Sequence, residues 1–330
     1  MIKSDTLPIG LALLLAFFVV ALGAYVRLSD AGLGCPDWPG CYGHVAVPQT
    51  PQAHADAVQA FPDRPIEPHK AWKEMIHRYA AGTLGLFILF IALRAWGRHQ
   101  RQRYSPLVPS LLLGLVIFQA LLGMWTVTLL LKPVIVTAHL LGGMATFGLL
   151  LWLFCRRNME YTDRTPLALR LAALLVLVLV LGQIALGGWV SSNYAALMCQ
   201  SFPECHPGEW LPQADFAQAF QWQRELGRNA EGELLPAAAL TAIHLVHRAG
   251  ALVVALAVGL LAVTLRRRAG LKGVGTAMLL ALALQVSLGV TNVLASLPLP
   301  VAVGHNAGAA LLLATLVIAI ARLGSRPSYR

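Results

Sequence analysis

The sequence predicts an all-α integral membrane protein, with eight transmembrane helices that form two parallel-repeat four-helix bundles. Apolar residues make up 57% of the 330 residues and charged residues 12%, whereas soluble domains have roughly 45–50% and 25%. Eight apolar runs of about 20 residues are each long enough to cross a bilayer. The second half of the chain also repeats the pattern of the first half, which predicts two similar units.

The expected membrane helices lie near residues 7–26, 75–96, 106–129, 134–155, 168–190, 238–265, 274–296 and 301–322. The connections at 130–133 and 297–300 are so short that the helices on either side must form antiparallel hairpins. Two long segments, 28–70 and 191–237, are rich in Pro, Gly, Asp and Trp. We expect irregular structure in both of them, with one short helix around 214–226.

An internal duplication divides the chain into two units. Residues 21–41 align without gaps on residues 185–205, and nine of the twenty-one positions are identical. Further along, His77-Arg78 matches His247-Arg248, and the segment 119–139 matches 285–305. An even number of helices in each unit makes the repeats parallel, related by an axis along the membrane normal. We therefore expect an N-terminal unit, 1–160, and a C-terminal unit, 161–330.

The distribution of basic residues predicts the orientation. Lys and Arg concentrate in the connections on the side that holds both termini, and the positive-inside rule places that side in the cytoplasm. The formal net charge of +10 follows mainly from this asymmetry, so we do not expect a nucleic-acid partner. The first apolar run is too long for a signal peptide and has a counterpart in the C-terminal unit. A bacterial cytoplasmic membrane is the simplest location for this multi-pass chain.

Each outer segment carries one pair of cysteines with five residues between them, Cys35/Cys41 and Cys199/Cys205. The outer side is oxidising in bacteria, which favours a disulfide within each pair. A metal site is the alternative, although the spacing fits no common zinc pattern. The fifth cysteine, Cys155, lies near the cytoplasmic end of the fourth run, and we expect an inert buried thiol.

Four of the apolar runs carry one histidine at a similar depth, within the outer half of the membrane. They are His77 and His139 in the N-terminal unit, and His247 and His305 in the C-terminal unit. Two imidazoles on facing helices of a bundle can hold a heme iron from opposite sides. The alternative is four polar side chains that hydrogen-bond between helices. Polar residues in hydrocarbon are costly, and the same spacing occurs twice, so heme binding is favoured.

The other histidines, His44, His54, His69, His99 and His206, are expected to be surface residues of loops.

Glu74 lies three residues before His77, so the two side chains share one face of a helix. The repeat places His244 opposite Glu74, and this difference between the units favours an enzyme with one reactive heme and one auxiliary heme. The alternative is that Glu74 complements the N-terminus of its helix and pairs with Lys70.

Three arginines are candidates for pairing with heme propionates, because guanidinium groups bind carboxylates through two parallel hydrogen bonds. Arg78 and Arg248 directly follow their histidines, and Arg27 lies at the outer end of the first helix. The alternative is that these side chains extend to the lipid headgroups.

The chain combines a duplicated four-helix unit, the Glu-x-x-His-Arg sequence at 74–78, a second His-Arg pair, two further histidines and the outer cysteine pairs. This combination resembles heme A synthase of the bacterial type. The resemblance covers nearly the whole chain. It implies that His247 and His305 are the axial ligands of a bound heme b. It also implies that His77 and His139 lie beside the iron of the substrate, heme O, with Glu74 as the catalytic acid. The implied reaction oxidises one ring methyl of heme O to a formyl through successive hydroxylations.

The implied partners are heme O, heme O synthase (a farnesyltransferase), the assembly of a terminal oxidase, membrane lipid and further copies of the chain. A non-catalytic di-heme b-type cytochrome is the alternative function, but it would place hemes near both faces of the membrane. A transporter with two rocking halves is a third, which leaves Glu74 and the cysteine pairs unexplained.

Overall fold

The computed structural model describes residues 3–99, 105–158 and 165–324. Within these ranges the regular elements are helices, and the only β pairing is three isolated bridges in the outer loops. The helices are α1 (Lys3–Leu28), α2 (Pro51–Ala60), α3 (Pro68–His99), α4 (Leu107–Thr128), α5 (Pro133–Asn158), α6 (Leu167–Ser192), the 3-10 helix η1 (Ala195–Leu197), α7 (Phe216–Ala219), α8 (Ala237–Arg266), α9 (Lys272–Leu294) and α10 (Leu299–Leu323).

Eight of these helices, α1, α3, α4, α5, α6, α8, α9 and α10, are long and apolar enough to cross a membrane. The predicted fold class is therefore confirmed. A helix suits this environment because it satisfies its own backbone hydrogen bonds where no water is present. The main difference is that α3 begins at Pro68, before the predicted 75–96. Its first two turns are polar and carry the helix beyond the apolar run, with Pro68 at the first position, where its missing N–H costs nothing.

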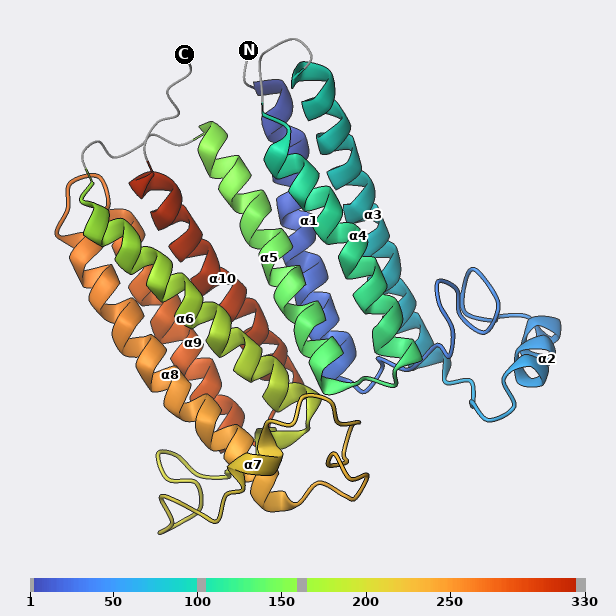
Figure 1. Cartoon of the computed structure of the whole chain (residues 1–330). Helices are drawn as coiled ribbons and strands as arrows, with labels where there is room; N and C mark the ends of the chain where they lie inside the picture. The colour runs from blue at the N-terminus through green and yellow to red at the C-terminus, as the bar shows by residue number, and fades with distance from the viewer. Residues whose placement is uncertain (1–2, 100–104, 159–164, 325–330) are drawn as a thin grey trace.

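The membrane helices form two groups side by side, α1 with α3, α4 and α5, and α6 with α8, α9 and α10 (Figure 1). The groups meet where α10 packs against α1 and α5, and where α5 packs against α6. In the repeat, α1 corresponds to α6 and α5 corresponds to α10. The contact of α1 with α10 is therefore equivalent to the contact of α6 with α5, which is consistent with the predicted duplication. The beginning of α1 and the end of α10 lie at one end of the bundle, and the two long loops lie at the other.

The interface between the groups is closely packed because small residues lie on it. Gly188 of α6 packs against α5, where a Cβ would lie only 3.0 Å from Leu140 Cδ2 and 3.3 Å from Thr137 Cγ2. Gly148 of α5 faces α10, with Val317 Cγ2 3.8 Å from the place of a Cβ. Met144 of α5 is fully buried in the same core. Small residues let membrane helices approach closely where the lipid offers no hydrophobic driving force.

The short connections form tight hairpins, as predicted. In the α4–α5 turn, the N–H of Leu131 donates to the carbonyl of Thr126 (2.8 Å), and in the α9–α10 turn the N–H of Leu297 donates to Asn292 (2.7 Å). Leu131 and Leu297 both have positive φ, 57° and 61°. Each turn therefore closes its helix with a left-handed residue at the same place in the repeat.

The prediction of irregular structure was wrong for part of the first outer loop, where α2 forms. Thr50 accepts a hydrogen bond from the N–H of Ala53 (3.2 Å), and Pro51 takes the first helical position. This cap and proline are a recognisable helix start that the composition of the loop concealed. In Figure 1, α2 is set away from the membrane helices.

The first outer loop also packs onto the start of α3. Cys35, Cys41 and Tyr42 are buried together with Ala71 and Met75 of α3. The Tyr42 hydroxyl donates to the carbonyl of Pro65 (2.8 Å), and burial raises the pKa of this phenol above its usual value, so it remains a donor at neutral pH.

In the second outer loop, the helix predicted around 214–226 is reduced to the single turn of α7. Asp215 caps it by accepting from the N–H groups of Ala217 and Gln218. The carbonyl of Ala219 then accepts from the Trp189 indole (2.9 Å) and is not used to continue the helix. The tertiary contact with α6 therefore decides where α7 ends.

Candidate functional site

The four histidines lie on α3, α5, α8 and α10, in two sets that the fold brings together. The rings of His77 and His139 have centroids 6.5 Å apart, with planes inclined at 76°. In the other half, His305 is close enough to His247 for the two rings to interact electrostatically. Each half of the molecule thus brings two imidazoles from different helices near one another.

Each of these rings faces a glycine on a neighbouring helix. A Cβ at Gly23 of α1 would lie 3.0 Å from His77 Nε2, and one at Gly289 of α9 would lie 3.0 Å from His305 Cε1. The corresponding distances are 3.5 Å from Gly123 of α4 to His139 Cε1 and 3.3 Å from Gly187 of α6 to His247 Cε1. These glycines were not among the predicted site residues, although their repetition at matching positions in both units was a signal that could have found them.

Two glutamines, which the sequence analysis also did not assign, contact the histidine rings of the C-terminal half. Gln183 Nε2 lies 3.0 Å from His247 Nδ1, and Gln285 Nε2 lies 3.3 Å from His305 Nε2. Nδ1 of His139 and Nδ1 of His305 are buried without a hydrogen-bond partner. An isolated glutamine within an apolar run was the signal, since such a residue needs a partner inside the protein.

Glu74 is buried, with 5% of its surface exposed, and links α3 to the first cysteine pair. One carboxylate oxygen accepts from the N–H of Cys35 (3.0 Å), and the other pairs with Arg78 Nη2 (2.5 Å). The alternative pairing with Lys70 is not formed, because Lys70 pairs with Glu67 (2.9 Å). Glu74 thus has two partners that hold its charge in place.

Arg78 completes this attachment of the first cysteine pair. Its Nη1 donates to the carbonyls of Pro39 (3.2 Å) and Gly40. The disulfide Cys35–Cys41 closes the segment that carries these carbonyls. We call Glu74, Arg78 and this segment the first loop clamp.

A second loop clamp lies at the matching place in the other half. His244, 4% exposed, accepts from the N–H of Cys199 (3.3 Å) through Nδ1. Arg248 donates to the carbonyls of Cys199 (3.2 Å) and Glu204 (3.1 Å), and its Nε lies 3.3 Å from His244 Nε2, which carries the ring proton when Nδ1 accepts. The disulfide Cys199–Cys205 closes this segment. His244 therefore takes the position of Glu74, with a neutral acceptor in place of a carboxylate.

Both predicted disulfides are present, which removes the metal alternative for these cysteines. Across the described ranges, no group of three or more His, Cys, Asp or Glu side chains could hold a metal ion. The remaining cysteine, Cys155, is free and buried, as expected.

Arg27 connects the two halves at their outer ends. Its guanidinium donates to the Tyr194 hydroxyl (3.0 Å) and to the carbonyl of Ser191 (2.8 Å), and it stacks 4.2 Å above the Tyr194 ring. Tyr194 also donates to Asp30 (2.9 Å). Arg27 also pairs with Asp30 of its own half (3.6 Å), so it has protein partners from both halves.

Arg224, in the second outer loop, is a buried cation that the sequence analysis left unassigned. Only 2% of its surface is exposed, and its Nε and Nη2 have no hydrogen-bond partner. It lies 5.5 Å from the centre of the Trp189 ring, and burial lowers the pKa of its guanidinium. The outer end of α6 therefore carries a desolvated positive charge.

The other histidines lie apart from these sets. His44 and His206 are half-buried loop residues. The expectation of loop positions was wrong for three of them, since His54 lies in α2, His69 in the first turn of α3 and His99 at the end of α3.

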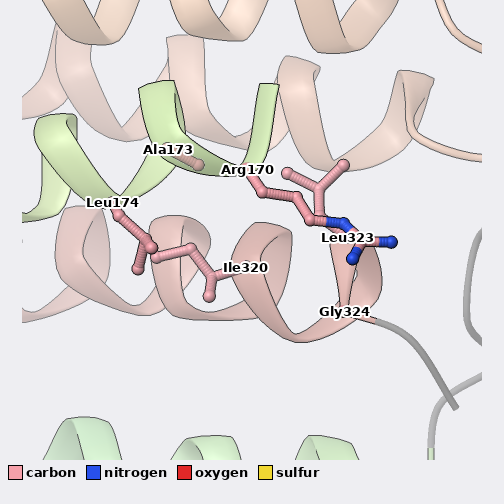
Figure 2. Close-up of a pocket in the computed structure, with 6 residues that line it drawn as sticks. All are labelled: Arg170, Ala173, Leu174, Ile320, Leu323 and Gly324. Atoms are coloured by element: carbon pink, nitrogen blue, oxygen red, sulfur yellow. The ribbon is translucent and has the colours of Figure 1, made fainter. Parts of the chain in front are cut away.

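A pocket of about 150 Å³ lies between α6 and α10 at the end opposite the outer loops (Figure 2). Its walls are apolar except for Arg170, which donates through Nε to Thr165 Oγ1 (2.8 Å). Because Leu323 and Gly324 line it, whereas His305 lies near the start of α10, this pocket is separate from the histidine sets.

Replacing the arginine of each loop clamp is expected to lower the free energy of unfolding by a different amount. Arg78→Met leaves the buried Glu74 charge unpaired and is expected to lower the free energy of unfolding by about 3–5 kcal/mol. Arg248→Met loses only hydrogen bonds to neutral groups, at a cost of about 1–3 kcal/mol. Denaturant titration of the purified protein in detergent measures both.

Two further variants serve as controls. Arg64→Met, on the same outer loop but exposed, should change stability by less than about 0.5 kcal/mol. Adding Glu74→Gln to Arg78→Met should recover part of the loss. Equal losses for the two single variants would contradict the assignment of Glu74 as a buried charge held by Arg78.

Comparison with known proteins identifies the family of the chain. The sequence profile of the family described as "Cytochrome oxidase assembly protein" matches residues 9–317. The heme A synthase of Shewanella oneidensis is 46% identical over 311 residues, which cover 93% of each chain. Those of Caulobacter vibrioides and a Methylobacterium species are both 29% identical, over 91% and 93% of this chain and 90% and 88% of their own. The chain therefore belongs to the cytochrome oxidase assembly protein family, together with these heme A synthases.

Proposed function

We propose that the chain is a heme A synthase, which oxidises a ring methyl of heme O to a formyl through successive hydroxylations. The observation that carries the proposal is the pair of histidine sets, each built from two helices, with every ring facing a glycine. In this proposal the N-terminal unit, 1–160, binds the substrate heme O between His77 and His139. The C-terminal unit, 161–330, holds heme b through His247 and His305.

The residues present fit such a group. Nδ1 of His139 and Nδ1 of His305 are buried without a partner. The contact of Gln285 with His305 Nε2 satisfies only one nitrogen of that ring, so hydrogen bonds between helices leave a nitrogen of each ring unaccounted for. Each ring lies directly against a glycine, where a Cβ would come within 3.0–3.5 Å of it, so the absence of a side chain lets the ring lie close to the neighbouring helix. An iron porphyrin bound by two imidazoles supplies the redox chemistry that removal of electrons from an inert methyl group requires.

Glu74 is the residue proposed to act on the substrate. Its helix position, one turn outward from His77, is occupied in the other unit by the neutral His244, so a buried carboxylate is present beside only one histidine set. In that place it can accept a proton or stabilise a developing positive charge. The bonds from Cys35 and Arg78 fix the carboxylate for this purpose.

The predicted pairing of arginines with propionates remains a prediction. Arg27, Arg78 and Arg248 already donate to protein groups in this structure. A carboxylate would therefore share their donors with these acceptors or replace them. Arg78 and Arg248 have primary roles in the two loop clamps.

The proposed location is a bacterial cytoplasmic membrane, with both termini in the cytoplasm and the loop clamps outside. Heme O would come from heme O synthase, and the product would serve the assembly of a terminal oxidase. Association with further copies of the chain is part of the same proposal.

Replacing either C-terminal histidine should remove heme b. His247→Ala and His305→Ala each take away one axial ligand, so most heme B should be absent from the purified protein, as pigment extraction and chromatography will measure. His206→Ala, in the outer loop, is the control and should keep its pigment. Unchanged heme B in His305→Ala would be incompatible with the proposed ligand set.

Glu74→Gln separates chemistry from attachment of the loop. The amide keeps an oxygen that can accept from the Cys35 N–H but removes the charge and the proton site. It also loses the ion pair with Arg78, but Arg78 still donates to the carbonyls of Pro39 and Gly40, so the loop stays attached. Cells with this variant as their only copy should retain heme b and accumulate heme O or a partly oxidised product. Glu67→Gln, which changes an acid at the start of the same helix, should leave heme A production intact. Normal heme A levels in Glu74→Gln would show that Glu74 only supports the structure.

The orientation is tested by reporter fusions. A green fluorescent protein fused to the C-terminus should fluoresce, because that terminus is expected in the cytoplasm. Alkaline phosphatase inserted near α2 should be active, because the enzyme needs the oxidising outer side. The reverse pattern would invert the proposed topology.

A further inference from the structure

Three of the four helix pairs around the histidines contain a glutamine that lies against a glycine of the opposite helix. The pairs are Gln119 of α4 with Gly142 of α5, Gln285 of α9 with Gly308 of α10, and Gln183 of α6 with Gly250 of α8. The first two pairs correspond under the repeat. The third pair has no equivalent in the N-terminal unit.

The repeat identifies the residues of the N-terminal unit that correspond to Gln183 and Gly250. Val19 lies two residues before the aligned segment that begins at 21, as Gln183 lies two before 185. Ala80 follows His77 by three residues, as Gly250 follows His247. The helix pair α1 and α3 thus has valine and alanine where α6 and α8 have glutamine and glycine.

Gln183 is held against His247 by two contacts from one amide nitrogen. Nε2 lies 3.0 Å from His247 Nδ1 and donates to the backbone carbonyl of His247 at 2.9 Å. The amide oxygen is buried and has no partner. A Cβ at Gly250 would overlap this oxygen and would lie 3.1 Å from Leu186 Cδ1. The Gln183 amide can therefore lie beside the His247 ring only because residue 250 is a glycine.

His77 has no such support. Val19 offers no hydrogen-bonding group, and Ala80 carries the Cβ that Gly250 lacks. Within residues 3–99, 105–158 and 165–324, no side chain hydrogen-bonds to the His77 ring; its close ring neighbour is His139. The orientation of His77 is thus less constrained than that of His247.

We infer that Gln183 is a positioning residue that fixes the His247 imidazole and so retains the resident heme, whereas its absence beside His77 leaves the N-terminal site able to exchange its ligand. This inference rests on the proposed function, in which one unit keeps a cofactor and the other takes up substrate and releases product. It assigns the difference between the two sites to the pair Gln183 and Gly250.

The chemistry of the amide suits this role. An imidazole that binds a metal through Nε2 keeps its proton on Nδ1 and donates it to a neighbouring acceptor. A half-turn of the Gln183 amide exchanges its nitrogen and oxygen and gives up the bond to the His247 carbonyl. One side chain can thus donate to a free ring and accept from a ligating one. Accepting this proton makes the imidazole a stronger donor to iron, which favours the ferric state and lowers the midpoint potential.

The main test compares two substitutions of Gln183 in protein purified from cells that make no heme O, so that heme b is the pigment measured. Gln183→Met has a similar length but no hydrogen-bonding group. Its heme should pass to added apomyoglobin about 10- to 100-fold faster than in the unmodified protein, and its midpoint potential should rise. Gln183→Glu keeps an acceptor, and should hold its heme with a potential at or below that of the unmodified protein.

Gln119→Met is the matched control, since it removes a buried glutamine that lies against a glycine but hydrogen-bonds to no histidine. It should leave the heme transfer rate and the potential unchanged. The reciprocal change, Val19→Gln with Ala80→Gly, builds the pair into the N-terminal unit. In cells that supply heme O, this variant should retain more heme O or heme A through purification.

The outcomes are distinct. An unchanged heme transfer rate and midpoint potential in Gln183→Met would overturn the inference. Shifts of the same size and direction in Gln183→Met and Gln183→Glu would also overturn it, because they would indicate an effect of packing alone. If Gln183→Met does not fold, the Glu variant and the reciprocal variant still decide, because neither effect follows from a structural role. Heme B retained in His247→Ala would overturn the proposed function instead.

Discussion

A polar group within hydrocarbon must find its partner inside the protein, and this constraint accounts for most of the polar contacts in the structure. Each unpaired group would cost several kcal/mol there, roughly 2–7 for an amide or hydroxyl. The few polar side chains of the membrane helices therefore gather with one another, as Gln183 does with His247 and Glu74 with Arg78. The atoms that remain without partners, such as His139 Nδ1, then mark the places where a bound group is expected.

The same constraint explains how the outer loops are attached. Arg78 and Arg248 are charged side chains on membrane helices. The charge of each is stabilised by the dipoles of backbone carbonyls in a segment that a disulfide closes. The loop thus solvates the arginine, and the arginine holds the loop over the histidines. The difference between the two clamps is electrostatic, because only Glu74 adds a negative charge. In His244 the acceptor is an imidazole, which satisfies the same N–H without that charge.

A duplicated fold allows one architecture to serve two purposes through a few substitutions. The glycines beside the four rings are common to both units and define the shape of each site. The differences that lie beside the rings include Glu74 in place of His244 and Val19 in place of Gln183. In the proposed function the first difference supplies a reactive group, and in the further inference the second changes how firmly a ligand ring is held. Both proposals place the difference between the units in residues next to the histidines, on the same helix for Glu74 and on the neighbouring helix for Gln183.

The sequence by itself determined the eight membrane helices, the two hairpins, the cysteine pairing and the choice of the four histidines. These follow from hydrophobic run length, loop length, compartment and repeated spacing, which are local or periodic properties. Only the tertiary structure decided that Arg78 and Arg248 bind loop carbonyls, that Glu74 pairs with Arg78 and not Lys70, and that Gln183 supports His247. A polar side chain finds its partner on the helix or loop that packs beside it. The residues next to it in the sequence do not specify which helix or loop that is.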